Sequence, residues 1–218
     1  MKTRIIFAAV GIPVLLLILL AAPSWATLAM CAALAAVASY ELMHAVGDEE
    51  WELLPAMPVL AAAMTGTPRG FASLALLRDA SAALALAPLV GAFMSDTGAY
   101  FMGRAMGRHK LCPHVSPNKT VEGCVGGFIG SVAGMIIYHL IVKATVTLDL
   151  GWALIIVLGL VGSLFGQIGD LSFSVIKREY GIKDYGTIFP GHGGVLDRFD
   201  SVLFVSPAYY LIITAVMA

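Results

Sequence analysis

The stretch KREYGIKDYGTIFPGHGGVLDRFD, from Lys177 to Asp200, concentrates basic residues, aspartates and a glycine-rich turn in a chain that is otherwise apolar. Asp170, Ser174 and Lys177 are spaced i, i+4 and i+7, so a helix would place them on one stripe. Carboxylate oxygens bind hard divalent cations, and lysine ammonium groups bind phosphates. The spacing therefore favours a metal ligand beside a phosphate-binding lysine, although an Asp170–Lys177 ion pair that only stabilises a helix end would use the same residues.

The second half of this stretch, FPGHGGVLDRFD, predicts a tight turn that leads into a helix. A Pro-Gly break and a Gly-Gly pair allow positive φ angles and close approach of the backbone. The helical pattern resumes at Val195, and the free N–H groups of a helix N-terminus attract anions. Asp197 and Asp200, at i and i+3 on that helix, are either ordinary first-turn acids or, together with Asp170, the ligands of a pair of cations.

Two further polar clusters interrupt the apolar sequence, SDTGAYFMGRAMGRHK (95–110) and SPNKTVEG (116–123). In the second cluster a Ser-Pro turn is predicted at Ser116. Lys119 follows it at the mouth of an apolar run, where an unpaired ammonium would be costly. Glu122, three residues on, is its expected local partner.

Other chemistries have no matching motif. His109, Cys112 and His114 lie close in the sequence, but their spacing fits no usual zinc site. The sequence contains no Walker A motif, no evident Ser-His-Asp order and no H-E-x-x-H. Carboxylates, basic residues and glycine turns in this combination indicate phosphoryl or nucleotidyl transfer, in which a divalent metal neutralises charge and lysines and arginines hold phosphates.

The elements that must position these clusters are hydrophobic helices. The chain of 218 residues is 59% hydrophobic and only 12% charged, with a mean hydropathy of +0.89. A soluble domain carries roughly twice that charged fraction, and apolar runs of about 18 residues cross a bilayer as helices. An all-α, polytopic bundle of about seven spans is therefore predicted. The runs that we read as spans are 5–22, 25–46, 53–67, 80–95, 124–142, 151–169 and 201–217.

Two of these runs leave alternatives open. The run 53–67 is short, contains two prolines, and is followed after a break by the apolar segment FASLALL. It could form one span, a re-entrant pair or an interfacial segment. The run 5–22 has the flanks of a cleavable signal peptide, but a full-length apolar run follows directly, so we expect it to be retained.

The basic residues are unevenly divided between the predicted loops. With seven spans and a cytoplasmic N-terminus, ten of the 13 Lys and Arg residues fall on one side, and Arg69, Arg78 and Lys143 fall on the other. This distribution follows the positive-inside rule and places all three polar clusters on the cytoplasmic face. The net charge of -1 indicates no particular partner, and three cysteines predict no disulfide framework.

The stretch SVIKREYGIKDYGTIFPGHGGVLDRFD (174–200) resembles the signature of the phosphatidate cytidylyltransferases, also called CDP-diacylglycerol synthases. The matching elements are a serine, Lys-Arg, Lys-Asp, Pro-Gly-His-Gly-Gly and Asp-Arg-x-Asp, in that order and at the expected spacing. SDTGAYFMGR and SPNKTVEG also resemble upstream motifs of that family, so the likeness covers roughly residues 85–217. Family members usually have more spans before the first motif. We therefore divide the chain into shortened N-terminal helices (1–80) and a catalytic transmembrane domain (81–218).

The resemblance implies a membrane nucleotidyltransferase that converts CTP and phosphatidate into CDP-diacylglycerol and pyrophosphate, by Mg²⁺-assisted in-line attack of the lipid phosphate on the α-phosphorus of CTP. It implies two cation sites, with Asp170 and Asp197 as metal ligands. The residues implied to be catalytic are Asp170, Asp197, Lys119, Lys177 and Arg178. Those implied to bind substrate are Asp96, Ser116, Asn118, Thr120, Glu122, Ser174, Lys183, His192, Gly193, Gly194, Arg198 and Asp200.

The implied partners are CTP, phosphatidate and the lipid bilayer, with no nucleic acid, and a homodimer is compatible with the resemblance. The implied location is the bacterial inner membrane, with the active site on the cytoplasmic side. Another CTP-dependent lipid enzyme, such as a polyprenol kinase or an archaeal-type lipid cytidylyltransferase, is the first alternative, and the Pro-Gly-His-Gly-Gly element argues against it. An ion-coupled transporter is the second, but it would place polar residues at mid-depth in several spans.

Overall fold

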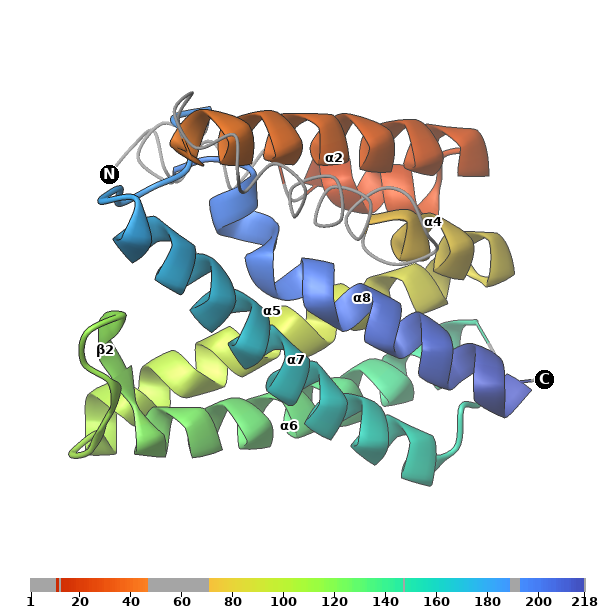
Figure 1. Ribbon diagram of the computed structural model, residues 1–218. Coiled ribbons are helices and arrows are strands. Elements are labelled where there is room, and N and C mark those ends of the chain that lie inside the picture. The colour runs from red at the N-terminus through yellow and green to blue at the C-terminus, as the bar shows by residue number, and fades with distance from the viewer. Residues whose placement is uncertain (1–10, 12, 47–70, 147, 189–192, 218) are drawn as a thin grey trace.

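The structure, a computed structural model, describes residues 11, 13–46, 71–146, 148–188 and 193–217 (Figure 1). Its labelled elements are six helices and one short antiparallel hairpin, as expected for an α-helical protein with long apolar runs. The helices are α2 (Ser24–Val46), α4 (Phe71–Ala80), α5 (Ala82–Met106), α6 (Val121–Thr145), α7 (Trp152–Glu179) and α8 (Leu196–Met217). The strands are β1 (Lys110–Cys112) and β2 (Ser116–Thr120).

Within the described residues, α2 and α5 to α8 are the helices long and apolar enough to cross a membrane. The predicted runs 25–46, 124–142, 151–169 and 201–217 correspond to α2, α6, α7 and α8. The 10 residues of α4 extend only about 15 Å, half of a hydrocarbon core of about 30 Å. The run 53–67 and part of the run 5–22 lie outside the described residues, so the total of seven spans stays a prediction.

Helix α5 extends eleven residues beyond the predicted run 80–95, to Met106. Ser81 caps its start by accepting a hydrogen bond from the backbone N–H of Ala83 at 3.3 Å. Its polar second half packs closely on α6, where a Cβ on Gly98 would collide with the backbone of Gly126. The polar cluster that begins at residue 95 therefore lies on a continuous helix.

The segment between α5 and α6 forms a short antiparallel hairpin. Strands β1 and β2 pair antiparallel, with Lys110 opposite Thr120. The turn lies at residues 113–115, so the turn predicted at Ser116 is wrong, because Ser116 is already in β2. The Thr120 hydroxyl accepts a hydrogen bond from the N–H of Gly123 at 3.0 Å and so caps α6.

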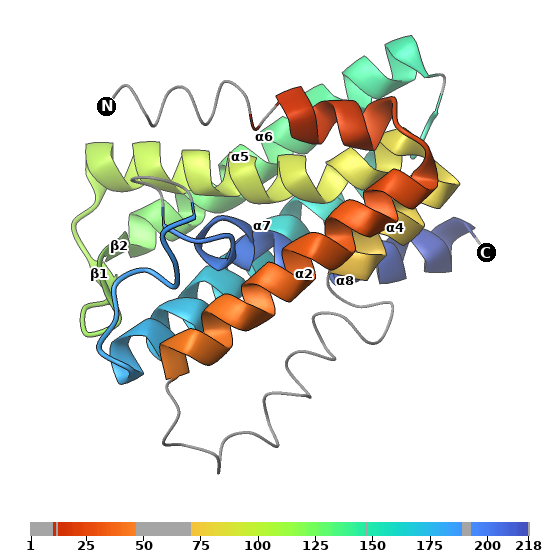
Figure 2. The same ribbon diagram turned by 90° about the horizontal axis from the view of Figure 1, so that it is seen from above.

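The polar ends of the helices gather at one end of the bundle. Figures 1 and 2 both place the hairpin, the end of α5, the start of α6 and the end of α7 on the left, and the C-terminus on the right. In the middle of the bundle, the buried Tyr209 donates a hydrogen bond to the carbonyl of Leu158 at 2.6 Å. The Tyr209 ring packs against Gly91 and Gly162, where a side chain would leave no room for it. This packing holds α5, α7 and α8 together next to the polar end of the bundle.

Candidate active site

An ion pair between Lys119 and Asp170 joins the hairpin to α7. The Lys119 Nζ lies 2.7 Å from Asp170 Oδ2, and both side chains are about a quarter to a third exposed (25% and 31%). The Lys119 ammonium is buried and, in the part of the chain that the structure describes, has no partner in hydrogen-bonding geometry, so its contact with Asp170 is ionic. Ser174 donates a long hydrogen bond of 3.4 Å to Asp170 Oδ1, as their shared helical stripe predicts.

The expected pairing of Lys119 with Glu122 is wrong. Lys119 belongs to β2, and α6 starts only at Val121, so the helical i, i+3 geometry does not apply to this pair. Glu122 instead accepts hydrogen bonds from the backbone N–H groups of Arg108 at 3.1 Å and His109 at 3.2 Å, and contacts the His109 ring at 2.6 Å. Glu122 therefore holds the chain between α5 and the hairpin.

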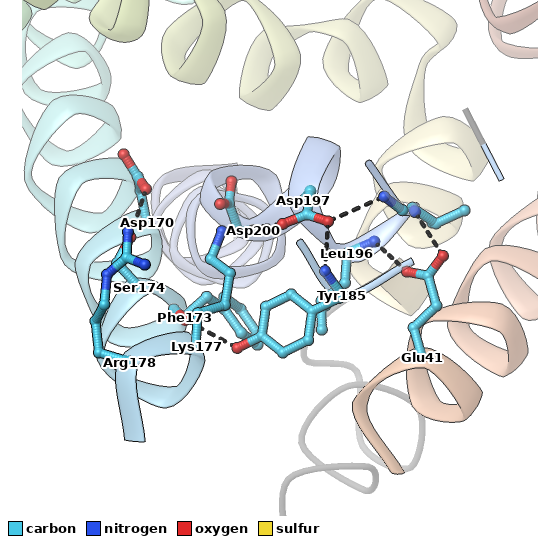
Figure 3. A network of polar contacts seen from close by, with 12 residues as sticks. Glu41, Asp170, Phe173, Ser174, Lys177, Arg178, Tyr185, Leu196, Asp197 and Asp200 are labelled. Carbon is cyan, nitrogen blue, oxygen red and sulfur yellow. Dashed lines mark hydrogen bonds and ion pairs between the residues drawn. The ribbon is translucent and has the colours of Figure 1, made fainter. Parts of the chain in front are cut away.

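A second ion pair, between Lys177 and Asp197, joins α7 to α8 (Figure 3). The Lys177 Nζ lies 2.9 Å from Asp197 Oδ1, and the two side chains are only 14% and 4% exposed. The other oxygen of Asp197 accepts hydrogen bonds from the backbone N–H groups of Tyr185 at 2.8 Å and Gly194 at 2.9 Å. Lys177 thus pairs with Asp197 and does not form the Asp170–Lys177 ion pair that the sequence left open.

Tyr185 lies against this second pair. Its hydroxyl donates a hydrogen bond of 2.8 Å to the carbonyl of Phe173, and the Lys177 ammonium lies 5.4 Å from its ring centre. Burial, assisted by the negative charges of Asp197 and Asp200, raises the pKa of Tyr185 above its usual range. The hydroxyl is therefore a neutral donor at physiological pH.

Three carboxylates from three helices lie close enough to repel one another electrostatically: Asp96, Asp170 and Asp200. Asp200 is buried and accepts a hydrogen bond from the N–H of Ser201 at 2.7 Å. Lys119 offsets the charge of Asp96, and Lys177 that of Asp200. Repulsion between carboxylates is costly near the end of membrane-spanning helices. Additional cations would lower this repulsion, so the cluster favours cation binding.

The donor atoms of this cluster are the type that Mg²⁺ prefers. Carboxylate and hydroxyl oxygens dominate, and hard cations bind oxygen. Within the described residues, however, no three His, Cys, Asp or Glu side chains are arranged as a metal site. Asp170 and Asp197 each hold a lysine ammonium instead. The donor chemistry therefore fits a divalent cation, and the two lysines lie where positive charge is required.

The start of α8 differs from the expectation. The sequence predicted free N–H groups there that would attract a substrate anion, but the N–H groups of Val195 and Leu196 are bonded to the carboxylate of Glu41, at 3.0 and 2.9 Å. Glu41 lies on α2 and is only 3% exposed. Sequence reasoning did not single it out, although an acidic residue inside the apolar run 25–46 was a usable signal.

The structure describes the other predicted residues as follows, with one exception. Arg178 donates a hydrogen bond of 3.0 Å from Nε to the carbonyl of Val115 and so contacts the hairpin turn. Lys183, Arg198 and Asn118 are exposed. Gly193 has a φ of 84°, which only glycine adopts easily. His192 lies outside the described residues.

A buried polar network beneath the site also escaped sequence reasoning. The hydroxyls of Ser95 and Ser163 are 2.9 Å apart, and both are buried. Gln167 donates to Ser163 at 2.8 Å and to the carbonyl of Cys124 at 3.2 Å. These bonds connect α5, α6 and α7 just below Asp96 and Asp170, and serine–serine bonds between distant helices leave no periodic sequence signal.

Comparison with known proteins agrees with the resemblance of the sequence motifs. The model of the cytidylyltransferase family matches residues 49–216. Proteins named phosphatidate cytidylyltransferase are 51% identical over 115 residues in Staphylococcus saprophyticus and 46% identical over 119 residues in Bacillus subtilis. These matches cover 53% and 55% of this chain and 43% of each relative, so the chain matches less than half of the length of these relatives. The family match extends over most of the chain: this protein belongs to the cytidylyltransferase family.

Proposed function

We propose that this chain transfers the cytidylyl group of CTP to phosphatidate and so forms CDP-diacylglycerol and pyrophosphate at a membrane surface. The family membership and the name shared by the relatives support this reaction. The single observation that carries the proposal is the convergence of two lysine–aspartate pairs at one end of apolar helices, Lys119–Asp170 and Lys177–Asp197. A polyphosphate and a lipid head group require such a concentration of charge at the bilayer edge.

The reaction replaces one phosphoanhydride bond with another. A phosphate oxygen of phosphatidate forms a bond to the α-phosphorus of CTP. The bond from that phosphorus to the oxygen bridging to the β-phosphorus breaks, and pyrophosphate leaves with the electron pair. The nucleophile is already an anion, so no general base is required. The main barrier is repulsion between two polyanions, which fixed positive charge lowers.

The lysines of the site are suited to hold the phosphates. The Lys119 ammonium lacks a hydrogen-bonding partner in the described part of the chain, so its N–H groups remain available to phosphate oxygens. Lys177 has three N–H donors, and Asp197 accepts from one of them. Arg178, Lys183 and Arg198 add positive charge at the same end. Together they orient CTP and stabilise the departing pyrophosphate.

Magnesium would bind at the carboxylates. Mg²⁺, when bound, neutralises phosphate charge and aligns the α-phosphorus for in-line attack. Asp170 and Asp197 would hold two cations, and Asp96 and Asp200 supply further oxygen donors nearby. Thr120 and Glu122 would act by fixing the hairpin that carries Lys119. We propose direct substrate contacts for Ser116, Asn118, Ser174, His192, Gly193 and Gly194.

We further propose that the site faces the cytoplasm of a bacterial inner membrane. The described basic residues support one orientation, because Arg78 and Lys143 lie at the end of the bundle opposite the site. The variant Lys110→Cys should react with an impermeant thiol reagent in inverted vesicles. The variant Asp149→Cys should react with this reagent only in intact cells. Both variants require a background without Cys31, Cys112 and Cys124. The reverse pattern would contradict this orientation and the access of CTP.

The position of a radioactive label in CTP tests the reaction itself. The purified chain in detergent, with Mg²⁺ and phosphatidate, should transfer label from the α-phosphate of CTP to the lipid and leave label from the γ-phosphate in pyrophosphate. A polyprenol kinase would give the opposite result with a prenol substrate, because a kinase transfers the γ-phosphate. Transfer of α-label to an archaeal-type ether lipid but not to phosphatidate would support the related lipid cytidylyltransferase instead.

A further inference from the structure

Glu41 is a buried carboxylate bonded to residues far away in the sequence. It lies on α2 at 3% exposure, and both of its oxygens accept backbone hydrogen bonds, from Val195 at 3.0 Å and Leu196 at 2.9 Å. An ionisable residue at this depth is costly without partners. Two N–H groups at the start of α8, together with the positive end of the helix dipole, are suitable partners for an anion. Glu41 therefore connects the N-terminal helices to the signature segment.

The signature segment approaches Glu41 twice. A Cβ on Gly186 or on Gly194 would collide with the Glu41 carboxylate, so both positions require glycine for this packing. Gly193, next to the second contact, takes a φ of 84°. The described backbone at Gly186 and at Gly194 thus packs against the Glu41 side chain, and the path of the chain at both positions depends on this carboxylate.

A short chain of contacts leads from Glu41 to the site (Figure 3). Gly194, which packs on Glu41, donates its N–H to Asp197 at 2.9 Å. Tyr185, the neighbour of Gly186, donates to the same oxygen at 2.8 Å. Asp197 in turn holds Lys177 at 2.9 Å. The two backbone donors that orient Asp197 are therefore adjacent to, or part of, the two glycine contacts of Glu41.

We propose that Glu41 is a positioning residue for the transfer reaction: it holds the backbone at Gly186 and at residues 193–196 in the arrangement that aims Asp197 and Lys177 at the substrates. The inference rests on the proposed function. Glu41 itself contacts neither substrate, and it acts through the backbone of Gly186 and Gly194. This role gives the N-terminal part of the chain a defined contribution to a site whose other residues all lie beyond residue 81.

Glu41→Gln tests the role with almost unchanged shape. The amide carbonyl can still accept one N–H, but the amide NH₂ would face the other N–H, and the negative charge at the helix N-terminus is lost. Hydrogen–deuterium exchange should become faster in residues 182–188 and 193–197, with no change in α5 and α6. The kcat for CDP-lipid formation should fall by about 10- to 100-fold, the usual effect of removing an orienting partner, while KM for CTP changes little.

Glu179→Gln is the matched control, because Glu179 is an exposed glutamate at the end of α7. It should leave both the exchange pattern and kcat unchanged. Glu41→Asp keeps the charge but shortens its reach, so its kcat should lie between those of Glu41→Gln and the wild type. A global loss of thermal stability with unchanged kcat in the folded fraction would show a merely structural role and overturn the proposal.

The hydrogen–deuterium exchange measurement distinguishes a failure of this inference from a failure of the proposed function. If the wild-type chain forms no CDP-lipid, the proposed function fails. Exchange confined to residues 182–188 and 193–197 in Glu41→Gln would still support the contact role of Glu41. Unchanged exchange in these residues would overturn the inference even if the wild-type chain is active.

Discussion

The two ends of the bundle carry ion pairs of similar length but different character. At the end opposite the site, Lys143 lies 2.7 Å from Asp149, six residues along the chain, and the side chains are 50% and 52% exposed. At the site end, Lys177 and Asp197 are 2.9 Å apart, but they come from two helices and are only 14% and 4% exposed.

The comparison shows that burial changes what an ion pair contributes to stability. An exposed, local pair contributes on the order of 0 to 1 kcal/mol and requires little ordering. A buried pair between helices costs desolvation that its attraction barely offsets, so apolar residues would often serve stability as well or better. Stability alone therefore does not account for the buried Lys177–Asp197 pair, which fits the proposed role of its charges toward substrate and cation.

The largest expected effect comes from removing the carboxylate charges at the site end. Asp170→Asn and Asp197→Asn should each abolish measurable turnover while the protein stays folded, because the amide keeps the shape but loses the charge that a hard cation requires. Asp149→Asn is the matched change at the opposite end and should keep full activity. The measurement is CDP-lipid formation over a range of Mg²⁺ concentrations. Near-normal turnover of either site variant at low Mg²⁺ would remove that residue from the metal site.

Lys119 should give the next largest effect. Lys119→Ala should cause a large loss in kcat/KM for CTP, and Lys119→Arg should restore only part of it, because arginine replaces a compact ammonium with a wider planar group. Thermal unfolding should show stability close to that of the wild type. If Lys119 only anchors the hairpin to α7, stability would fall and the kinetics of the folded protein would be ordinary. Full activity in both variants would exclude Lys119 from the nucleotide site.

The long helices could be predicted from the sequence because each one is a long apolar run. The positions of α2, α6, α7 and α8 follow the predicted runs within a few residues at most ends. The predicted run 80–95 ends before α5 does, because polar residues begin at Ser95. The helix continues beyond this point, and glycines there allow it to pack closely on α6. The hairpin was missed because two strands of three and five residues leave no alternating pattern.

The residues of the site could be predicted better than their partners. The signature and the clusters singled out Asp170, Lys177 and Asp197 by residue type and spacing, and the structure places all three in ion pairs. The partners of Lys119 and of Glu41 are set by tertiary contacts. Glu41 is hydrogen-bonded to Val195 and Leu196, which follow it in the sequence by 154 and 155 positions. Local pairing rules apply only within one element, so they could not indicate either contact.

Tyr185→Phe should give a smaller effect at the site end. Removing the hydroxyl deletes the hydrogen bond to the Phe173 carbonyl, which contributes about 1 kcal/mol to the free energy of unfolding, and activity should fall only a few-fold. Because burial raises the pKa of Tyr185, this stability is present below the usual tyrosine pKa of about 10 and is lost only as the pH rises through the higher folded value. Chemical denaturation should therefore show a constant difference from about pH 6 to about pH 9. A difference that disappears within this range would contradict a neutral, bonded hydroxyl.

The smallest effect is expected at the opposite end. The hydrogen bond from Lys143 holds the pKa of the exposed Asp149 below its usual range. A lowered folded pKa contributes stability above the ordinary aspartate range and loses it as the pH falls. Because the pair is exposed, Lys143→Ala should change neither activity nor thermal midpoint beyond experimental error at neutral pH. A loss of turnover comparable to that of Lys119→Ala would remove the functional distinction between the two ends.

The stoichiometry of the wild-type reaction tests the central claim most directly. The purified chain in detergent receives CTP, phosphatidate and Mg²⁺, and both CDP-diacylglycerol and pyrophosphate are quantified over time. Cytidylyl transfer at the site end predicts one pyrophosphate for each CDP-diacylglycerol formed, and neither product when phosphatidate is omitted. Release of inorganic phosphate without CDP-lipid, or absence of any lipid product from a folded chain, would contradict the account.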